Sequence, residues 1–146
     1  MEWIDDHYCF VCGKDNPHGL HLDFVIKDNK IYTEYTFPKK FQGYADVVHG
    51  GMLGVILDEV MVNLPWKIYD IPVVSAELTL RLKKPVNVGE KLIFSGEIEK
   101  EIKNIIYTKG EAKLENGEVV AVATAKCMKV TLEKLSENLK KVKNHT

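Results

Sequence analysis

The sequence predicts an α+β fold in which β-strands surround one buried helix, and three observations support this prediction. Residues 52–64 are apolar on nearly every side of a helical projection, and such a helix is normally enclosed by protein. The segments on both sides alternate apolar and polar residues, which is typical of half-buried strands. The predicted order is two strands, one helix, four strands and a tail helix, with no repeat or linker.

The size and composition indicate a single domain spanning residues 1–146. A chain of 146 residues with 45% hydrophobic content can bury a substantial core. The formal charge of -1 leaves no basic surplus for nucleic acid. No apolar run approaches the roughly 20 residues of a membrane span, and the acidic N-terminus does not have the pattern of a signal peptide. We therefore expect a cytoplasmic protein with no nucleic-acid or membrane partner.

The individual strands follow from alternation and from turn residues between them. The predicted strands cover residues 20–26, 31–37, 73–82, 91–100, 104–114 and 119–130. Asn116-Gly117 is a hairpin turn signal, and the last strand carries alanines at every second position, which would let the helix approach closely. Apolar residues spaced three or four apart predict a surface helix over 132–142, within a C-terminal tail of 131–146.

The segment 73–82 gives the clearest strand pattern in the chain. Its apolar residues occupy the even positions from 74 to 82. Strict alternation therefore places Ser75 on the opposite face, together with Glu77, Thr79 and Arg81. We expect that face to meet solvent or, in an oligomer, the wall of a site.

Two adjacent acids, Asp58 and Glu59, interrupt the apolar helix. A carboxylate on a buried helix must be hydrogen-bonded, paired or functional, because desolvating the charge is costly. Asp58 shares its stripe with Gly51 and Gly54, whereas Glu59 lies about 100° away among bulkier neighbours. Glycine weakens a helix by about 1 kcal/mol relative to alanine. The stripe therefore indicates close approach of either a ligand or another backbone, and spacing alone leaves both open.

The tripeptide His49-Gly50-Gly51 opens this helix and favours a ligand. Free backbone N–H groups at a helix N-terminus bind carbonyl oxygens and developing oxyanions. Other catalytic motifs are missing from the sequence, which has no Gly-x-Ser-x-Gly elbow, no Gly-x-x-x-x-Gly-Lys-Ser/Thr loop and no Gly-x-Gly-x-x-Gly turn. We therefore expect neither a Ser-His-Asp triad nor a phosphate-binding loop.

These residues also carry a family resemblance. His-Gly-Gly at the start of a buried helix, with an acid nine positions after the histidine, resembles the PaaI-like hotdog-fold acyl-CoA thioesterases. The lead-in Cys-Phe-Val-Cys-Gly-Lys-Asp-Asn-Pro-His-Gly-Leu at residues 9–20, in the turn-rich segment 1–19, resembles one branch of that family. The resemblance covers about residues 9–130. It implies a hotdog fold, with a curved antiparallel sheet of about six strands wrapped around one long central helix.

The resemblance also implies a thioester hydrolase working as a homodimer or a dimer of dimers. Asp58 would be the nucleophile or general base, and the Gly50 N–H of the partner subunit would polarise the carbonyl. His49 would shape the loop or, as an alternative, act as a catalytic base, and Ser75 would orient water or the acid. Glu59 is the rival acid; as a structural group it would pair with Arg81 or a backbone N–H.

The implied substrate is a small, medium-chain or aromatic acyl-CoA, with no cofactor. Candidate substrate-binding residues are Gln42, Gly51, Met52, Met61 and Val62. Two alternatives remain: a non-catalytic protein that binds acyl-CoA or an acyl carrier, and a structural dimer without chemistry. Retention of an acid at position 58 favours catalysis, because a pure binder gains nothing from an acid beside a thioester.

The cysteines give a separate signal. The chain has three, Cys9, Cys12 and Cys127, and an odd number argues against a disulfide framework. Cys9 and Cys12 form half of a zinc motif, with histidines nearby at irregular spacing. No second Cys-x-x-Cys pair follows. We therefore expect no metal and two reduced, partly buried thiols.

Overall fold

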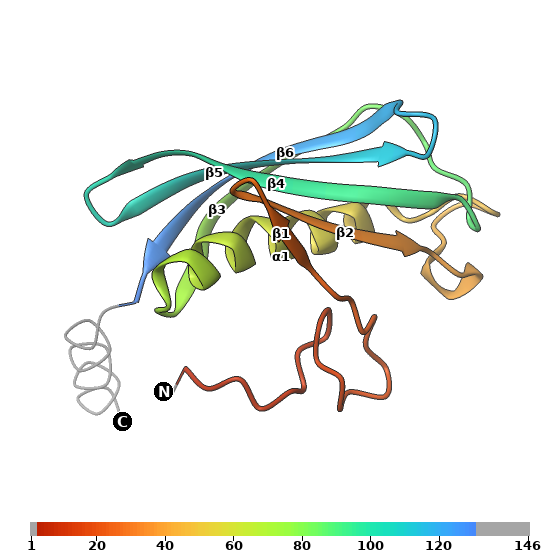
Figure 1. The fold of residues 1–146 in the computed structure, drawn as a ribbon. Helices are drawn as coiled ribbons and strands as arrows, with labels where there is room; N and C mark the ends of the chain where they lie inside the picture. The colour runs from red at the N-terminus through yellow and green to blue at the C-terminus, as the bar shows by residue number, and fades with distance from the viewer. Residues whose placement is uncertain (1–2, 131–146) are drawn as a thin grey trace, which may run out of the picture.

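The computed structural model describes residues 3–130, which form one long helix packed against one face of a six-stranded antiparallel sheet (Figure 1). The elements are β1 (Val25–Lys27), β2 (Lys30–Thr36), the 3-10 helix η1 (Lys39–Phe41), α1 (Gly50–Tyr69), β3 (Val73–Leu82), β4 (Lys91–Ile102), β5 (Ile105–Leu114) and β6 (Val119–Lys129). The strand order is β1-β2-β4-β5-β6-β3. The predicted α+β, hotdog-like arrangement is confirmed, and the predicted helix at 132–142 lies outside the described residues.

The core forms between α1 and the inner face of the sheet. Ala121, Ala123 and Ala125 of β6 are all buried, and α1 contacts this strand as well as β3, β4 and β5. Their small side chains let the helix lie close to the sheet, as the alternation of alanines predicts. No helix among the described residues is long and apolar enough to cross a membrane.

The helix continues through Pro65 to Tyr69, one turn beyond the predicted end at residue 64. A proline inside a helix has no N–H to donate to the carbonyl four residues earlier, here that of Met61. The thiol of the buried Cys127 lies 3.8 Å from this oxygen and donates to it. The sheet thus partly satisfies the carbonyl that the proline leaves free. Asp70 follows the last helical residue and caps the helix, with a left-handed φ of 53° that is usual for this position.

The lead-in covers the side of α1 away from the sheet, where Figure 1 shows the N-terminal segment crossing below the helix. Val11, Leu20 and Leu22 are buried in the core cluster. The Leu22 N–H donates to the Val11 carbonyl, so residues 20–24 belong to this loop and the predicted first strand shrinks to β1. The helix is apolar all round because the sheet covers one side and the lead-in covers the other.

A β-bulge in β3 changes the predicted facing of Ser75. The register pairs Ser75 with Cys127 but Glu77 with Lys126, so Ala76 is an extra residue without a partner. Directly opposed residues in an antiparallel pair lie on the same face. Ser75 therefore shares the helix-facing side with the buried Cys127, whereas Glu77 lies on the outer face. The prediction that these two residues share one face is wrong, because a bulge cannot be read from alternation.

Candidate active site

The N-terminus of α1 presents a free amide at Gly50. His49 caps the helix, since its Nδ1 accepts a hydrogen bond of 3.0 Å from the Gly51 N–H, and its carbonyl accepts from the Met52 N–H. The Gly50 N–H has no hydrogen-bond acceptor among residues 3–130. A helix N-terminus with one uncommitted N–H can bind a carbonyl oxygen and stabilise negative charge on it.

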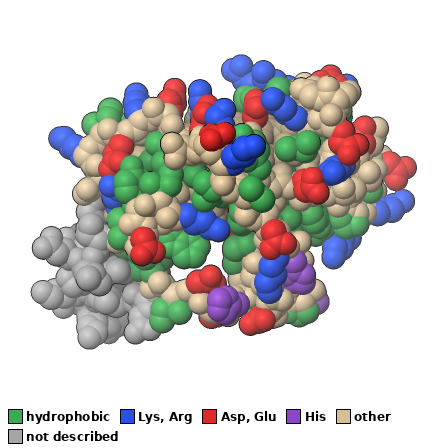
Figure 2. Space-filling model, viewed as in Figure 1, with side chains coloured by type: hydrophobic (Ala, Val, Ile, Leu, Met, Phe, Trp, Pro, Cys, Tyr) green, Lys and Arg blue, Asp and Glu red, His purple; other side chains and the backbone are tan. Residues whose placement is uncertain are grey.

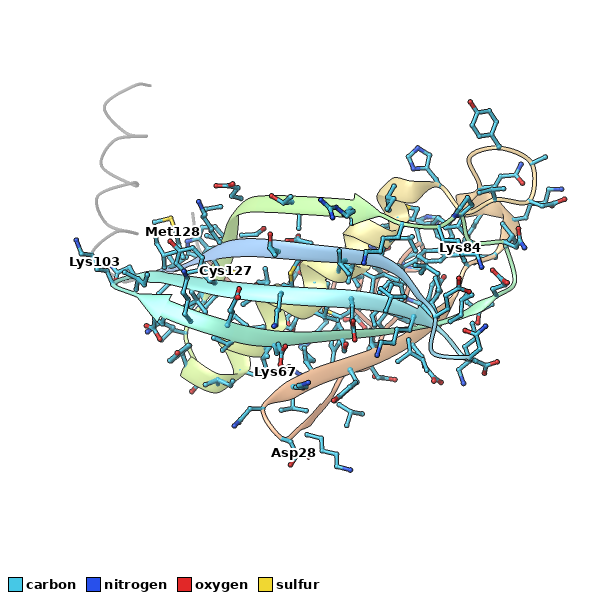
Figure 3. All side chains as sticks on the ribbon, turned by 90° about the horizontal axis from the view of Figure 1, so that it is seen from above. Asp28, Lys67, Lys84, Lys103, Cys127 and Met128 are labelled. Carbon is cyan, nitrogen blue, oxygen red and sulfur yellow. The ribbon has the colours of Figure 1, made fainter. Side chains whose placement is uncertain are left out.

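A pocket of about 580 Å³ opens at this end of the helix, and His49 and Gly50 line it. Figure 3 shows Lys84 at the end of the sheet where α1 begins, opposite the end that carries Lys103 and Met128. Lys83 and Lys84 both line the pocket. Lys84 pairs with Glu118 at 2.8 Å, whereas Lys83 has no ion pair within the described part of the chain. The pocket therefore combines an apolar wall, a helix N-terminus and a free cation.

Asp58 carries a buried oxygen that nothing satisfies. Its Oδ1 is the only buried side-chain oxygen or nitrogen in residues 3–130 without a hydrogen-bond partner. Burial raises the pKa of the Cys127 thiol, a hydrogen bond with Thr108 lowers it in part, and the negative charge of Asp58 adds a smaller increase. Asp58 therefore lies near Cys127, the residue that Ser75 opposes across the β3–β6 pair. The bulge places the Ser75 hydroxyl on the same side of the sheet as this acid.

Two glycines of α1 show which way the Asp58 stripe faces. A Cβ added at Gly50 would lie 2.4 Å from Leu82 Cδ1, and one added at Gly54 would lie 3.0 Å from Leu80 Cδ2. The first turns of α1 therefore pack closely on β3, and the space beside Gly54 is filled by the Leu80 side chain. Gly51 is exposed, and an added Cβ there would meet only the His49 ring.

The acid and the amide do not meet within one chain. A rise of about 1.5 Å per residue puts Asp58 about 12 Å along the helix from Gly50. Gly50 packs on β3, a ten-residue strand at the edge of the sheet, and Asp58 lies about two turns further along the helix. On the helix-facing side of β3, Leu78 and Leu82 are 42% and 50% exposed, although they point toward the core layer. An open edge with exposed leucines is a surface that a second chain can cover.

The predicted substrate-binding residues differ in how accessible they are. Met52 and Val62 are half-buried on α1 and accessible. Met61 is fully buried and packs against Gly110 of β5 in the core. Gln42 accepts a 3.1 Å hydrogen bond from the Asp46 N–H, so its side-chain oxygen holds the loop that precedes the helix.

Glu59 faces the lead-in. Its Oε1 lies 3.5 Å from Cys9 Sγ and 3.1 Å from Cys12 Sγ. Burial, and then the hydrogen bond to Glu59, raise the pKa of the Cys12 thiol. The predicted partner Arg81 instead lines a hollow on the outer face of the sheet. Sequence reasoning noticed the cysteine pair and the acid separately but had no signal that joins them.

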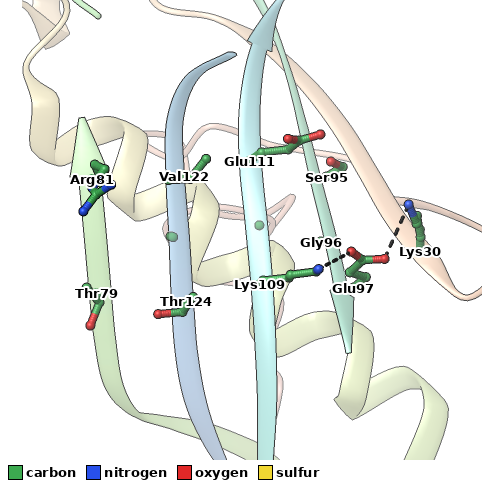
Figure 4. Close-up of a pocket in the computed structure, with 12 residues that line it drawn as sticks. Lys30, Thr79, Arg81, Ser95, Gly96, Glu97, Lys109, Glu111, Val122 and Thr124 are labelled. Atoms are coloured by element: carbon green, nitrogen blue, oxygen red, sulfur yellow. Dashed lines mark ion pairs between the residues drawn. The ribbon is translucent and has the colours of Figure 1, made fainter. Parts of the chain in front are cut away.

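The hollow that Arg81 lines has a volume of about 450 Å³ and lies on the face of the sheet away from α1 (Figure 4). Glu97 in its wall pairs with Lys30 and Lys109, at 3.4 and 3.2 Å. None of the predicted site residues lines this hollow. The candidate chemistry is therefore on the helix side of the sheet.

Comparison with known proteins gives a family and a set of similar structures. Residues 45–121, more than half of the chain, match the family model described as the thioesterase superfamily. No curated protein matches the chain. Among solved structures, the phenylacetic acid degradation-related protein of Ralstonia eutropha JMP134 is 27% identical, with a TM-score of 0.68, over 75% of this chain and 85% of that one.

Two further structures share the fold. The PaaI protein of the Escherichia coli phenylacetic acid degradation operon has a TM-score of 0.70 at 16% identity, over 77% of this chain and 81% of its own. The protein smu.793 of Streptococcus mutans UA159, solved bound to acetyl CoA, has a TM-score of 0.68 at 16% identity, over 75% of this chain and 88% of its own.

Proposed function

Because the chain belongs to the thioesterase superfamily, we propose that it hydrolyses an acyl-CoA thioester at a site shared between two subunits. The observation that carries the proposal is the buried Oδ1 of Asp58, which has no partner in residues 3–130. Asp58 as a whole is half-buried, but a buried carboxylate oxygen without a partner costs stability, and groups of this kind are kept where chemistry needs them. Structures of smu.793 with acetyl CoA and of a Streptococcus pneumoniae protein with coenzyme A support an acyl-CoA ligand.

The open edge of β3 supports the shared site. In a two-fold dimer the same surface on each subunit meets its copy, so two β3 strands would pair antiparallel across the axis. Gly50 and Gly54 pack against leucines of β3 in each chain, and Asp58 follows one turn after Gly54. Antiparallel pairing would therefore bring the helix N-terminus of one subunit toward the middle of the other subunit's helix. This arrangement removes the separation of about 12 Å that a single helix imposes.

Hydrolysis of a thioester needs a carboxylate that acts as a base and a hydrogen-bond donor for the carbonyl oxygen. Asp58, as a base, takes a proton from water while the water oxygen bonds to the thioester carbonyl carbon. The carbonyl oxygen gains negative charge, which the Gly50 N–H of the partner subunit stabilises. The carbon–sulfur bond then breaks, the thiolate takes the proton from Asp58, and a carboxylic acid and free coenzyme A leave. Direct attack by Asp58 would use the same groups through an anhydride that water opens.

The remaining candidates support these two groups. The Ser75 hydroxyl, placed on the helix side by the bulge, would orient the water or the acid. His49 caps the helix and so holds the Gly50 amide in place. Lys83 at the pocket would attract the phosphates of coenzyme A, since it has no ion pair among residues 3–130. Met52 and Val62 remain the candidates for contact with the acyl chain.

A panel of acyl-CoA substrates, assayed by release of free thiol, tests the proposal. Short, medium-chain and aromatic acyl groups should be compared at equal concentration, because the apolar lining does not select among them. We expect turnover of at least one class. Binding of acyl-CoA measured by calorimetry, without thiol release for any class, would instead indicate the non-catalytic binding protein.

A further inference from the structure

We propose that Cys9, Cys12 and Glu59 bind one zinc ion that joins the lead-in to α1. The sequence spacing predicts no metal because the two cysteines have no second ligand pair nearby. The fold supplies a third ligand from the central helix, 47 residues after Cys12. The three donor atoms, one from each side chain, all lie within 4.8 Å of one another.

The spacing of the donor atoms suits tetrahedral zinc. With zinc–sulfur and zinc–oxygen distances of about 2.3 and 2.1 Å, a tetrahedral site separates a sulfur from an oxygen ligand by about 3.6 Å. Glu59 Oε1 lies 3.5 Å from Cys9 Sγ and 3.1 Å from Cys12 Sγ. Small side-chain movements therefore suffice to form the site, with no change in the backbone.

The backbone around the cysteines is already arranged for a metal ligand. The Val11 N–H points at Cys9 Sγ at 3.4 Å, and backbone donors of this kind orient and stabilise a metal-bound thiolate. The Gly13 N–H donates to the Cys9 carbonyl, and a Cβ at residue 13 would lie 2.3 Å from the Cys9 nitrogen. Only glycine allows a turn this tight, so the Cys-x-x-Cys-Gly segment holds both sulfurs on the same side.

The charges around Glu59 also favour a cation. This half-buried carboxylate forms no ion pair with a lysine, arginine or histidine within residues 3–130, and its side chain contacts the two thiols instead. Two thiolates and a carboxylate suit zinc better than magnesium or calcium, which prefer oxygen ligands alone. No fourth histidine, cysteine or acid of the described residues joins the cluster, so a water molecule would complete the coordination.

The site would fix the lead-in on the helix that carries Asp58. Figure 2 shows histidine and acidic side chains on the lead-in surface. His7, His18 and His21 are exposed, and none of them belongs to the cluster of Cys9, Cys12 and Glu59. The ion would thus join the lead-in to α1 through these three side chains. Its test is independent of thioesterase activity.

The first experiment measures metal content and affinity. Protein purified without chelator should contain about one zinc per chain by elemental analysis, and the stripped protein should regain it in a titration against a competing chelator. Cys12→Ser and Glu59→Gln should each weaken zinc binding by more than about 100-fold, beyond the 10–100-fold typical of second-sphere changes. His18→Gln, an exposed change in the same loop, is the matched control and should bind zinc as the unaltered chain does.

A second measurement guards against variants that fail to fold. Cobalt(II) added to the stripped, unaltered protein should give a thiolate-to-metal charge-transfer band and the strong visible bands of a tetrahedral site. Zinc should also raise the melting temperature of the unaltered chain and of His18→Gln, but not of Glu59→Gln. Absence of zinc and of the cobalt bands in the unaltered chain would overturn the proposal. So would zinc binding that is equal in all the folded variants.

Discussion

The change Asp58→Asn separates chemistry from folding at the proposed active site. The substitution keeps the side-chain volume and removes the negative charge, so Asp58 no longer serves as base or nucleophile. We expect kcat to fall by about 100-fold or more, the usual contribution of a positioned base, with acyl-CoA binding nearly unchanged. An unsatisfied buried polar group costs about 1–3 kcal/mol, and more if it is charged. The neutral amide keeps a polar atom at this position but removes the charge, so stability should stay unchanged or increase slightly.

Thiol release and thermal unfolding, measured on the same preparations, test both parts. For a chain of this size, 1 kcal/mol corresponds to about 2–4 °C in melting temperature. Asp70→Asn at the other end of α1 is the matched control, because residue 70 is exposed and asparagine tolerates its left-handed φ of 53°. Full turnover by Asp58→Asn would refute the catalytic role of the acid. A large loss of stability in an Asp58→Asn protein that is still active would refute the argument about the buried charge.

The remaining predictions concern the donor, the dimer and the helix. Gly50→Pro in a Leu82→Ala background, which removes the N–H without a clash, should lower kcat by about 100-fold relative to Leu82→Ala alone. Leu78→Lys should charge the open edge of β3 and give inactive monomers by light scattering, and an active monomer would exclude the shared site. Cys127→Ala should lower the free energy of unfolding by about 1 kcal/mol, because the Met61 carbonyl that Pro65 leaves free loses its donor. In a Pro65→Ala background, where residue 65 has its own N–H, a double-mutant cycle should show a smaller loss.

The sequence predicts the order of elements and the central helix well, because both depend on local patterns. Apolar and polar residues alternate clearly in β3 to β6, and the apolar run in α1 predicts a buried helix. The end of α1 is missed because Pro65 normally stops a helix. The carbonyl that Pro65 leaves free accepts a hydrogen bond from Cys127 in β6, far away in the sequence, and no local pattern reveals that contact.

The site is predicted only in part, for a similar reason. His49, Gly50 and Asp58 belong to one continuous segment, so their spacing is visible in the sequence. The facing of Ser75 depends on a bulge, which adds one residue to β3 and reverses the alternation. The contact of Glu59 with the lead-in depends on how two segments pack, and no local pattern encodes that.

The most direct test of the shared site is a mixing experiment with two inactive variants. One chain carries Asp58→Asn and the other carries Gly50→Pro with Leu82→Ala, and the two are unfolded and refolded together in equal amounts. If each site takes its acid from one chain and its amide from the other, about a quarter of the sites should contain both intact groups. We predict that thiol release rises to about a quarter of the activity of Leu82→Ala protein refolded in the same way. Mixed oligomers, confirmed by differently tagged chains, that stay as inactive as the separate variants would contradict the shared site.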